Sequence, residues 1–127
     1  MAYYLARAKV SQEAMDALVK RPEDRFVTMT RLLKGVGGRL HYYFFCFGDH
    51  DIVLLFELPG DVTAAALSMV LTSSGSVTEI ETTPLLTMEE AIEAMRIAGG
   101  ATGVYAPPGR PPKAASKKKK ARTRAAP

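Results

Sequence analysis

The chain contains no tryptophan, only one cysteine and no apolar run longer than a strand. A single cysteine, Cys46, excludes an internal disulfide and is typical of a reducing compartment, so we expect a cytoplasmic protein. The short apolar runs predict no membrane-spanning helix. The first residues, MAYYLARAKV, also lack the basic and hydrophobic regions of a secretory signal, so we expect no signal peptide.

Acidic residues are missing from the C-terminal part of the chain. From Gly99 onward there are eight Lys or Arg residues and no Asp or Glu, whereas residues 1–98 hold nine basic and thirteen acidic residues, a net charge of −4. Large apolar side chains are also scarce after Gly100, so this segment cannot bury enough surface to offset its ordering entropy. We therefore expect one domain over residues 1–98 and a disordered basic tail over residues 99–127.

Local patterns predict the element order β-α-β-β-α-β followed by a last helix. Alternating or apolar stretches indicate strands, and capping residues with Gly or Pro mark the helix ends. Pro22 is expected as the first residue of the second helix, and Asp61 as the N-cap of the third. This order is that of an α+β, ferredoxin-like domain with a four-stranded antiparallel sheet plus a C-terminal helix. The expected strands cover 2–10, 38–47, 51–58 and 76–84, and the expected helices cover 11–20, 22–36, 62–74 and 88–98.

The two middle strands form a hairpin whose two sides are both apolar. Helices cover only one side of a ferredoxin-like sheet, so a second apolar side indicates an interface. We expect a homodimer through this sheet face; coverage by the C-terminal helix is the alternative. With Asp49-His50 as a two-residue turn, one side carries His41, Tyr43, Phe45, Phe47, Ile52, Leu54, Phe56 and Leu58, and the other carries Leu40, Tyr42, Phe44, Cys46, Val53, Leu55 and Glu57.

Charged residues alternate along the first and last strands. Arg7 and Lys9 lie in the first, and Glu79 and Glu81 lie in the last. These strands are antiparallel neighbours in this topology, so cross-strand ion pairs are expected. A partly polar ligand cavity between two facing sheets is one interpretation, and a solvated rim of salt bridges is the other. The residues expected to bind a ligand in such a cavity are Arg7, Tyr42, Cys46 and Glu57.

Four short motifs resemble the GYD domain, a small family of mainly bacterial proteins. They are Gly37-Gly38-Arg39-Leu40, Gly48-Asp49-His50-Asp51, Pro59-Gly60-Asp61 and Gly75-Ser76-Val77. The second fills the place of the family's Gly-x-Tyr-Asp hairpin, so His50 stands where the family usually has Tyr. The resemblance covers residues 3–98. It implies a dimeric α/β barrel, in which two ferredoxin-like domains join their sheets face to face, and it implies a fold without an established activity.

Residues with metal-ligand chemistry gather at the hairpin tip. Asp49, His50 and Asp51 are adjacent there and point in different directions, and at ~3.3 Å per residue His41 lies roughly 20 Å or more away. We therefore expect no metal site. Asp51 is expected to accept hydrogen bonds from its own turn backbone. Cys46, with no His or second Cys beside it, is expected to be a small buried hydrophobe.

The sequence contains no catalytic-triad signature and no phosphate-binding glycine pattern. We expect a homodimeric module without a cofactor that binds a small ligand or a protein partner rather than catalysing a reaction. A small cofactor-free enzyme is the alternative: related dimeric barrels carry oxygenase or isomerase chemistry between their sheets, and the candidate acid or base residues here are His41, His50 and Asp51.

Nucleic-acid association is a further alternative, carried by the tail alone. The acidic domain lacks the aromatic run with which RNA-recognition domains stack bases. The tail could neutralise phosphates without sequence preference, or it could simply keep the protein dissolved. The expected polyanion-binding residues are Lys117, Lys118, Lys119, Lys120, Arg122 and Arg124.

Overall fold

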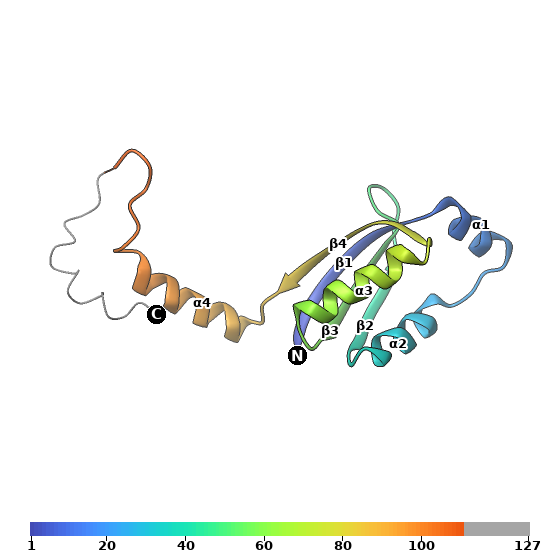
Figure 1. Cartoon of the computed structure of the whole chain (residues 1–127), viewed down its shortest axis with the longest axis horizontal. Helices are drawn as coiled ribbons and strands as arrows, with labels where there is room; N and C mark the ends of the chain where they lie inside the picture. Colours follow the sequence, from blue (N-terminus) through green and yellow to red (C-terminus); the bar gives the residue numbers. More distant parts are fainter. Residues whose placement is uncertain (111–127) are drawn as a thin grey trace. The chain divides into compact units, whose positions relative to one another are not determined.

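The structure, a computed structural model, describes residues 1–110 and has two compact units, Met1–Leu86 and a second that begins at Thr87. Within the described residues, no helix is long and apolar enough to cross a membrane. The second unit contains α4 (Met88–Ala101). The first contains β1 (Ala2–Val10), α1 (Gln12–Lys20), α2 (Arg25–Gly35), β2 (Arg39–Phe45), β3 (Ile52–Leu58), α3 (Asp61–Ser73) and β4 (Val77–Leu85) (Figure 1).

The strands form one antiparallel sheet in the order β2-β3-β1-β4. The central strand β1 pairs with β3 on one side, from Ala2–Leu58 to Ala8–Ile52, and with β4 on the other. The first and last strands are therefore neighbours although they are far apart in the sequence. This arrangement confirms the predicted α+β ferredoxin-like fold.

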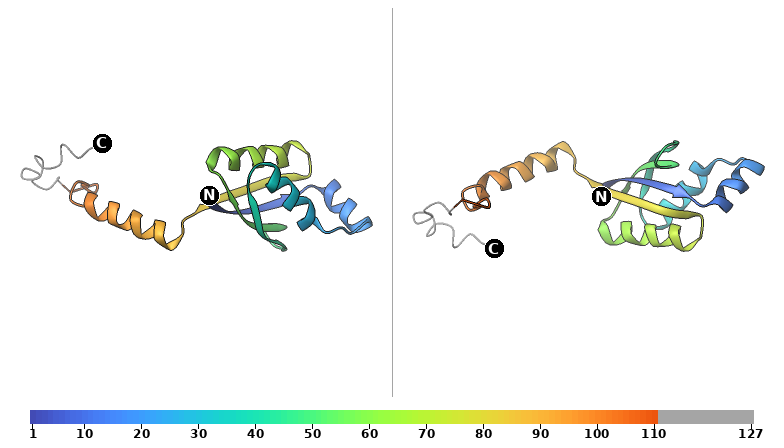
Figure 2. Two further views of the ribbon diagram at one scale, coloured as in Figure 1. Left: turned by 90° about the horizontal axis from the view of Figure 1, so that it is seen from below. Right: turned by 90° about the horizontal axis from the view of Figure 1, so that it is seen from above.

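One side of the sheet is buried under helices. Along β3 every second residue is buried, and the alternate residues are half-exposed. In both views of Figure 2, α3 runs along one side of β1 and β4. Burying these apolar side chains supplies the main stabilisation of the domain, at about 1.5–3 kcal/mol for each large one. The core comprises Tyr4, Ala6, Ala8, Leu40, Ile52, Leu54, Phe56, Leu58 and Val77 from the strands, with Met29 and Leu33 from α2 and Ala64 and Leu67 from α3.

The first two helices are capped by side chains that precede them. Ser11 accepts a hydrogen bond from the Ala14 N–H at 3.1 Å, as predicted for the start of α1. The prediction that Pro22 begins α2 is wrong. Asp24 accepts a hydrogen bond from the Phe26 N–H at 2.9 Å, so this carboxylate caps a helix that begins three residues after the proline.

The turn from α2 into β2 depends on two glycines. Gly37 has φ +83°, and its N–H donates to the Lys34 carbonyl at 3.1 Å, which ends the helix as predicted. Gly38 lies so close to β3 that a Cβ there would overlap the Glu57 carbonyl oxygen. The absence of a side chain at Gly38 therefore fixes where β2 begins against β3.

The hairpin β2–β3 differs from the prediction in two respects. Leu40 pairs with Phe56 and Tyr42 with Leu55, so His41 is an extra residue, a β-bulge, on β2. The bulge reverses the predicted sides of Leu40 and His41 and places Leu40 in the core. The predicted two-residue turn is also wrong, because the last strand pair is Phe45–Ile52 and residues 46–51 form a longer loop.

The capping of α3 and α4 agrees with the prediction in one case. Thr87 and Glu90 form the predicted capping box of α4. Gly60, not Asp61, is the N-cap of α3, and no side chain caps that end. Helix α4 continues through both glycines to Ala101, whereas the sequence predicted its end at residue 98. The predicted tail beyond Arg110 lies outside the described residues.

Candidate functional site

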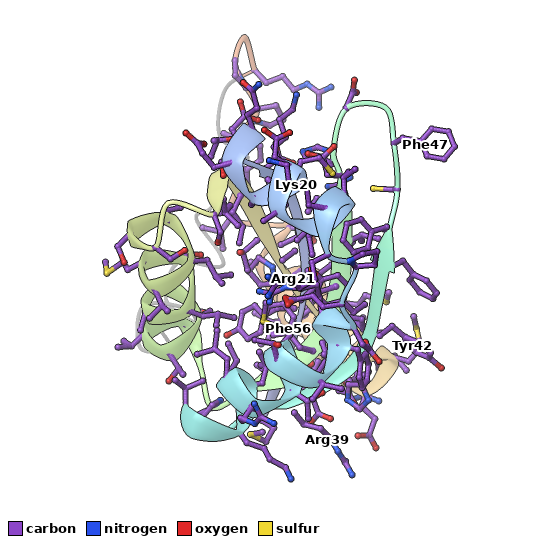
Figure 3. The ribbon with its side chains drawn as sticks, turned by 90° about the vertical axis from the view of Figure 1, so that its right-hand side faces the viewer. Lys20, Arg21, Arg39, Tyr42, Phe47 and Phe56 are labelled. Carbon is purple, nitrogen blue, oxygen red and sulfur yellow. The ribbon has the colours of Figure 1, made fainter. Side chains whose placement is uncertain are left out.

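Within the first unit, the side of the sheet that faces away from the core carries a mixed apolar and charged surface. We call it the open face and define it by the residues that alternate with the buried ones and pair with each other across the strands. Figure 3 shows Tyr42 and Phe47 pointing outward from the hairpin, whereas Phe56 lies on the inner side among the helices. The open face comprises Tyr3, Leu5, Arg7 and Lys9 of β1, Arg39, His41, Tyr42 and Phe44 of β2, Val53, Leu55 and Glu57 of β3, and Glu79, Glu81, Thr83 and Leu85 of β4.

The middle of the open face is apolar. Leu5 pairs with Leu55, and Leu55 pairs in turn with Tyr42, so these three form one row across the sheet. In the next row, Val53 pairs with Phe44, which is 59% exposed and stacks on Tyr42 with 5.8 Å between ring centroids. Exposed aromatic and aliphatic side chains in adjacent rows form the kind of continuous patch that marks a binding surface.

One end of the open face holds a histidine–carboxylate pair. The His41 Nε2 lies 2.7 Å from Glu57 Oε2, and the two side chains are only 26% and 14% exposed. The His41 ring also stacks on Tyr3, with 5.7 Å between ring centroids. The bulge positions this imidazole, because the extra residue turns His41 toward the same side as Glu57.

This pair can hold or transfer a proton. When Glu57 is ionised, Nε2–H donates to its carboxylate and leaves Nδ1 as the available acceptor in neutral imidazole. The carboxylate then fixes the tautomer and the ring orientation, as a partner of a catalytic histidine does. The geometry therefore permits general acid or base chemistry at His41.

The loop between β2 and β3 is fastened to β1 by Asp51. Its Oδ2 accepts a hydrogen bond from the Val10 N–H at 3.0 Å, and its own N–H donates to the Ala8 carbonyl at 2.9 Å. The prediction that this carboxylate bonds to its own turn backbone is therefore wrong, because its partner lies on another strand. Asp51 fixes the position of the loop.

His50 is held by this loop at the other end of the open face. Its Nε2 lies 3.7 Å from Glu81 Oε1, and the Arg7 guanidinium lies 3.8 Å from the same oxygen. Arg7 and Glu81 are direct cross-strand partners, which confirms the predicted ion pairing between the first and last strands. The second predicted pair, Lys9 with Glu79, is also in register. The structure thus places a second polar group at the end opposite to His41.

Cys46 follows the last residue of β2 and belongs to the loop. Its backbone N–H donates to the Asp51 carbonyl at 2.8 Å, and its thiol donates to the His50 carbonyl at 3.3 Å. The side chain is half-buried. Within residues 1–110, no three His, Cys, Asp or Glu side chains come together in a way that could hold a metal ion.

Two tyrosines on the core side, the buried Tyr4 and the half-buried Tyr43, have raised pKa values. The Tyr4 hydroxyl donates to Asp61 Oδ1 at 2.7 Å, and this hydrogen bond, with burial and the nearby negative charge, raises the pKa of Tyr4. Burial raises the pKa of Tyr43, and the Arg25 guanidinium beside its hydroxyl partly offsets the rise. Neither tyrosine reaches the open face, and the Tyr4–Asp61 bond joins β1 to the first turn of α3.

The sequence indicated some of these groupings and missed others. Of the predicted ligand-binding residues, Arg7, Tyr42 and Glu57 share the open face, whereas Cys46 lies in the loop. The pairing of His41 with Glu57 was missed, because only the bulge brings their side chains together. The predicted polyanion-binding residues of the tail lie outside the described residues.

Comparison with known proteins identifies one family. The family model of the GYD domain matches residues 4–95, which include the sheet except for the first two residues of β1 and the first part of α4. No curated protein and no solved structure matches the chain. The match covers well over half of the sequence and includes all four motifs that resemble this family. The chain belongs to the GYD domain family.

Proposed function

We propose that the protein is a homodimeric module of the cytoplasm, in which two copies join their open faces and bind a small ligand or a protein partner. The apolar middle of the open face supports this proposal more than any other observation. Tyr42 and Phe44 are 57% and 59% exposed and adjoin the aliphatic row of Leu5 and Leu55. A second copy brings an identical surface, so the same rows become the inner layer between two sheets.

The charges of the open face are compatible with such an assembly. His41 contacts Glu57 at one end of this face, and Arg7 pairs with Glu81 beside Val53. Lys9 and Glu79 are in register as cross-strand partners, as are Arg39 and Glu57. Pairing lowers the free-energy cost of removing these groups from water. A ligand between the sheets would then meet an apolar wall with polar groups at its ends.

The oligomeric state tests this proposal directly. We expect light scattering of the full chain at micromolar concentration to give the mass of a dimer. Phe44→Asp places a charge in the apolar middle at an exposed position, so it should give a folded monomer. Val62→Asp is the matched control, because Val62 is 86% exposed on α3, on the other side of the sheet. A monomeric wild-type protein would refute the proposal.

A small cofactor-free enzyme is the second candidate, and the His41–Glu57 pair favours it. A half-buried imidazole with a carboxylate at 2.7 Å is an arrangement suited to moving a proton on a bound substrate. The Tyr3 ring stacks on one face of the His41 imidazole and shields that face from water. In this reading the apolar rows hold the substrate and His41 acts as acid or base, while Glu57 positions it.

A further inference from the structure

A hollow region lies on the helix side of the sheet and is separate from the open face. Its inner part is a crevice of about 200 Å³ beneath α1. Three of its lining residues, Met29, Ile52 and Val77, belong to the buried core, and Ala14 and Leu18 of α1 form its outer wall. No residue of α1 is buried, so this helix covers the crevice without filling it. Glu23, Arg25 and Ser76 also line the crevice, so its wall is mostly apolar with a few polar groups, as in ligand-binding pockets.

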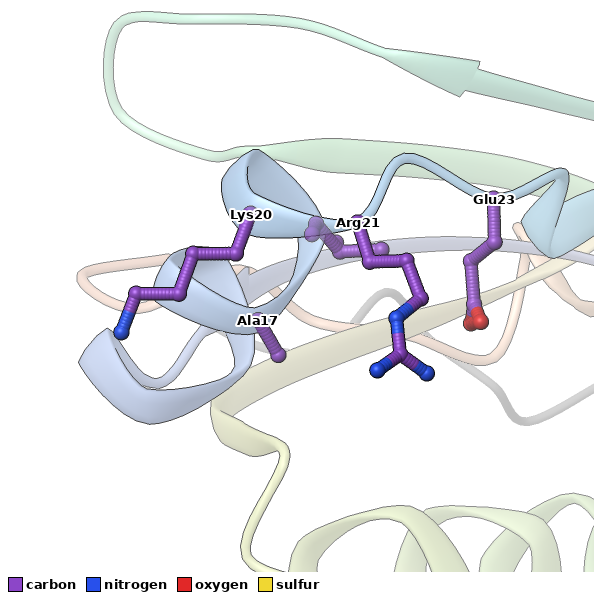
Figure 4. Close-up of a pocket in the computed structure, with 5 residues that line it drawn as sticks. Ala17, Lys20, Arg21 and Glu23 are labelled. Atoms are coloured by element: carbon purple, nitrogen blue, oxygen red, sulfur yellow. The ribbon is translucent and has the colours of Figure 1, made fainter.

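An open hollow of about 390 Å³ adjoins the crevice at the end of α1. Ala17, Leu18 and Glu23 line both spaces, so the hollow leads into the crevice. Figure 4 shows Arg21 and Glu23 extending in the same direction from the segment after α1, and Lys20 extending from the end of the helix. The two spaces together form a passage from a polar mouth to an apolar interior.

The mouth is positively charged. Glu23 Oε2 lies 2.7 Å from Arg25 Nη1, so that acid is already compensated. Within residues 1–110, no ion pair involves Lys20 or Arg21. The charged residues that line the two spaces are three cations (Lys20, Arg21 and Arg25) and one acid (Glu23), a net charge of +2. The mouth therefore favours an anionic group.

We infer that this passage binds a small aliphatic carboxylate, with its tail in the crevice and its carboxylate at Lys20 and Arg21. A water-sized group occupies about 30 Å³, so a crevice of about 200 Å³ holds a tail of roughly six or seven such groups. The tail fills the space that α1 leaves open and contacts Met29 and Ile52. The carboxylate lies in the hollow that Lys20 and Arg21 both line, and no described acid neutralises either cation.

The test is a titration of the full-length protein followed by NMR of its methyl groups. Hexanoate should shift the Met29 and Ile52 methyl signals in a saturable way. Tails longer than about seven groups should bind no more tightly, because the crevice volume limits them. 1-Hexanol should shift the same signals, and hexylammonium should bind more weakly than either. Absence of a saturable shift at Met29 and Ile52 would overturn the inference.

Three variants locate the binding. Arg21→Gln should raise the hexanoate Kd about two- to fivefold, as expected for an exposed ion pair, and leave the 1-hexanol Kd unchanged. Arg31→Gln removes the same charge from α2, outside both spaces, and should change neither the hexanoate Kd nor the 1-hexanol Kd. Ala17→Phe fills the junction at an exposed position and should abolish the shifts for both probes. Equal effects of Arg21→Gln and Arg31→Gln, or unchanged shifts in Ala17→Phe, would show that the passage is not the site.

Discussion

His41 and Glu57 face each other across β2 and β3, with 2.7 Å between Nε2 and Oε2. The contact exists because a bulge inserts one extra residue into β2, and without it the imidazole would point into the core side of the sheet. A polar pair is thus placed at the edge of an apolar surface by backbone geometry. This pair is the feature of the open face most suited to chemistry.

The pair should be energetically coupled. We expect His41→Ala and Glu57→Ala each to lower the free energy of unfolding by about 1 kcal/mol, and the double variant to cost less than the sum, because both remove the same half-buried hydrogen bond. Denaturant unfolding at one fixed protein concentration measures this. Glu79→Ala, an exposed acid on β4, is the control and should change stability by less than about 0.5 kcal/mol. Strict additivity would show that the contact contributes nothing.

The carboxylate of Asp51 should stabilise the domain, and that of Asp49 should not. Asp51→Ala leaves the Val10 N–H without its acceptor, so we expect a loss of about 1–3 kcal/mol and faster hydrogen exchange of the Val10 amide. Asp49→Ala is a matched control in the same loop, since Asp49 is exposed. If the two variants have the same free energy of unfolding, the hydrogen bond from Val10 to Asp51 does not hold the loop.

The Tyr4–Asp61 bond should make stability depend on alkaline pH. The folded-state pKa of Tyr4 is raised above its ordinary value of 10.0, so the folded protein holds this proton more tightly than the unfolded chain. The contribution of the Tyr4–Asp61 bond to the free energy of unfolding is therefore constant below pH 10. It decreases as the pH rises from 10 through the folded-state pKa of Tyr4. Urea unfolding at pH 8 and at pH 10.5 measures the decrease.

Two variants separate this contribution from general alkaline unfolding. Asp61→Asn removes the charge and brings the pKa of Tyr4 closer to 10.0, so the variant should lose about 1 kcal/mol at pH 8 and show a smaller further loss at pH 10.5. Tyr4→Phe should lose this pH-dependent contribution entirely. Asp16→Asn, on the exposed side of α1, is the control. The same pH dependence in wild type and Tyr4→Phe would contradict the assignment.

The basic tail remains a predicted polyanion-binding segment. We expect the full chain to bind duplex DNA weakly, with log K falling against log salt concentration by about 0.9 for each phosphate neutralised. Truncation to residues 1–110 should abolish this binding, because the remaining domain is acidic. Filter binding or fluorescence anisotropy at several salt concentrations measures it, and equal affinity of the two chains would rule out a role of the tail.

The order of the elements could be predicted from the sequence, because periodicity and capping are local signals. The box of Thr87 and Glu90 and the glycine end of α2 are examples. The two sides of the hairpin could only partly be predicted. One inserted residue at His41 reverses the alternation on its N-terminal side, and the local pattern contains no mark of it.

The partners of the polar side chains were the least predictable part. Asp51 bonds to Val10 across 41 residues, and Tyr4 bonds to Asp61 across 57. In each case the local pattern predicts a nearby partner, in a turn for Asp51 and at a helix N-cap for Asp61, because such a partner is chemically adequate. The first bond depends on where the loop lies against β1, and the second depends on how α3 packs against the sheet.

The interactions that hold the loop in place do not involve the side chain of His50. Gly48, with φ +125°, shapes the loop and Asp51 fastens it, while the His50 side chain contributes only its Nε2 contact with Glu81. A tyrosine at this position, as in the Gly-x-Tyr-Asp pattern that this hairpin resembles, would be held by the same loop. It would present a hydroxyl in place of an imidazole. In this protein, therefore, the side chain at position 50 can change the chemistry at one end of the open face without any change in the hydrogen bonds that hold the loop.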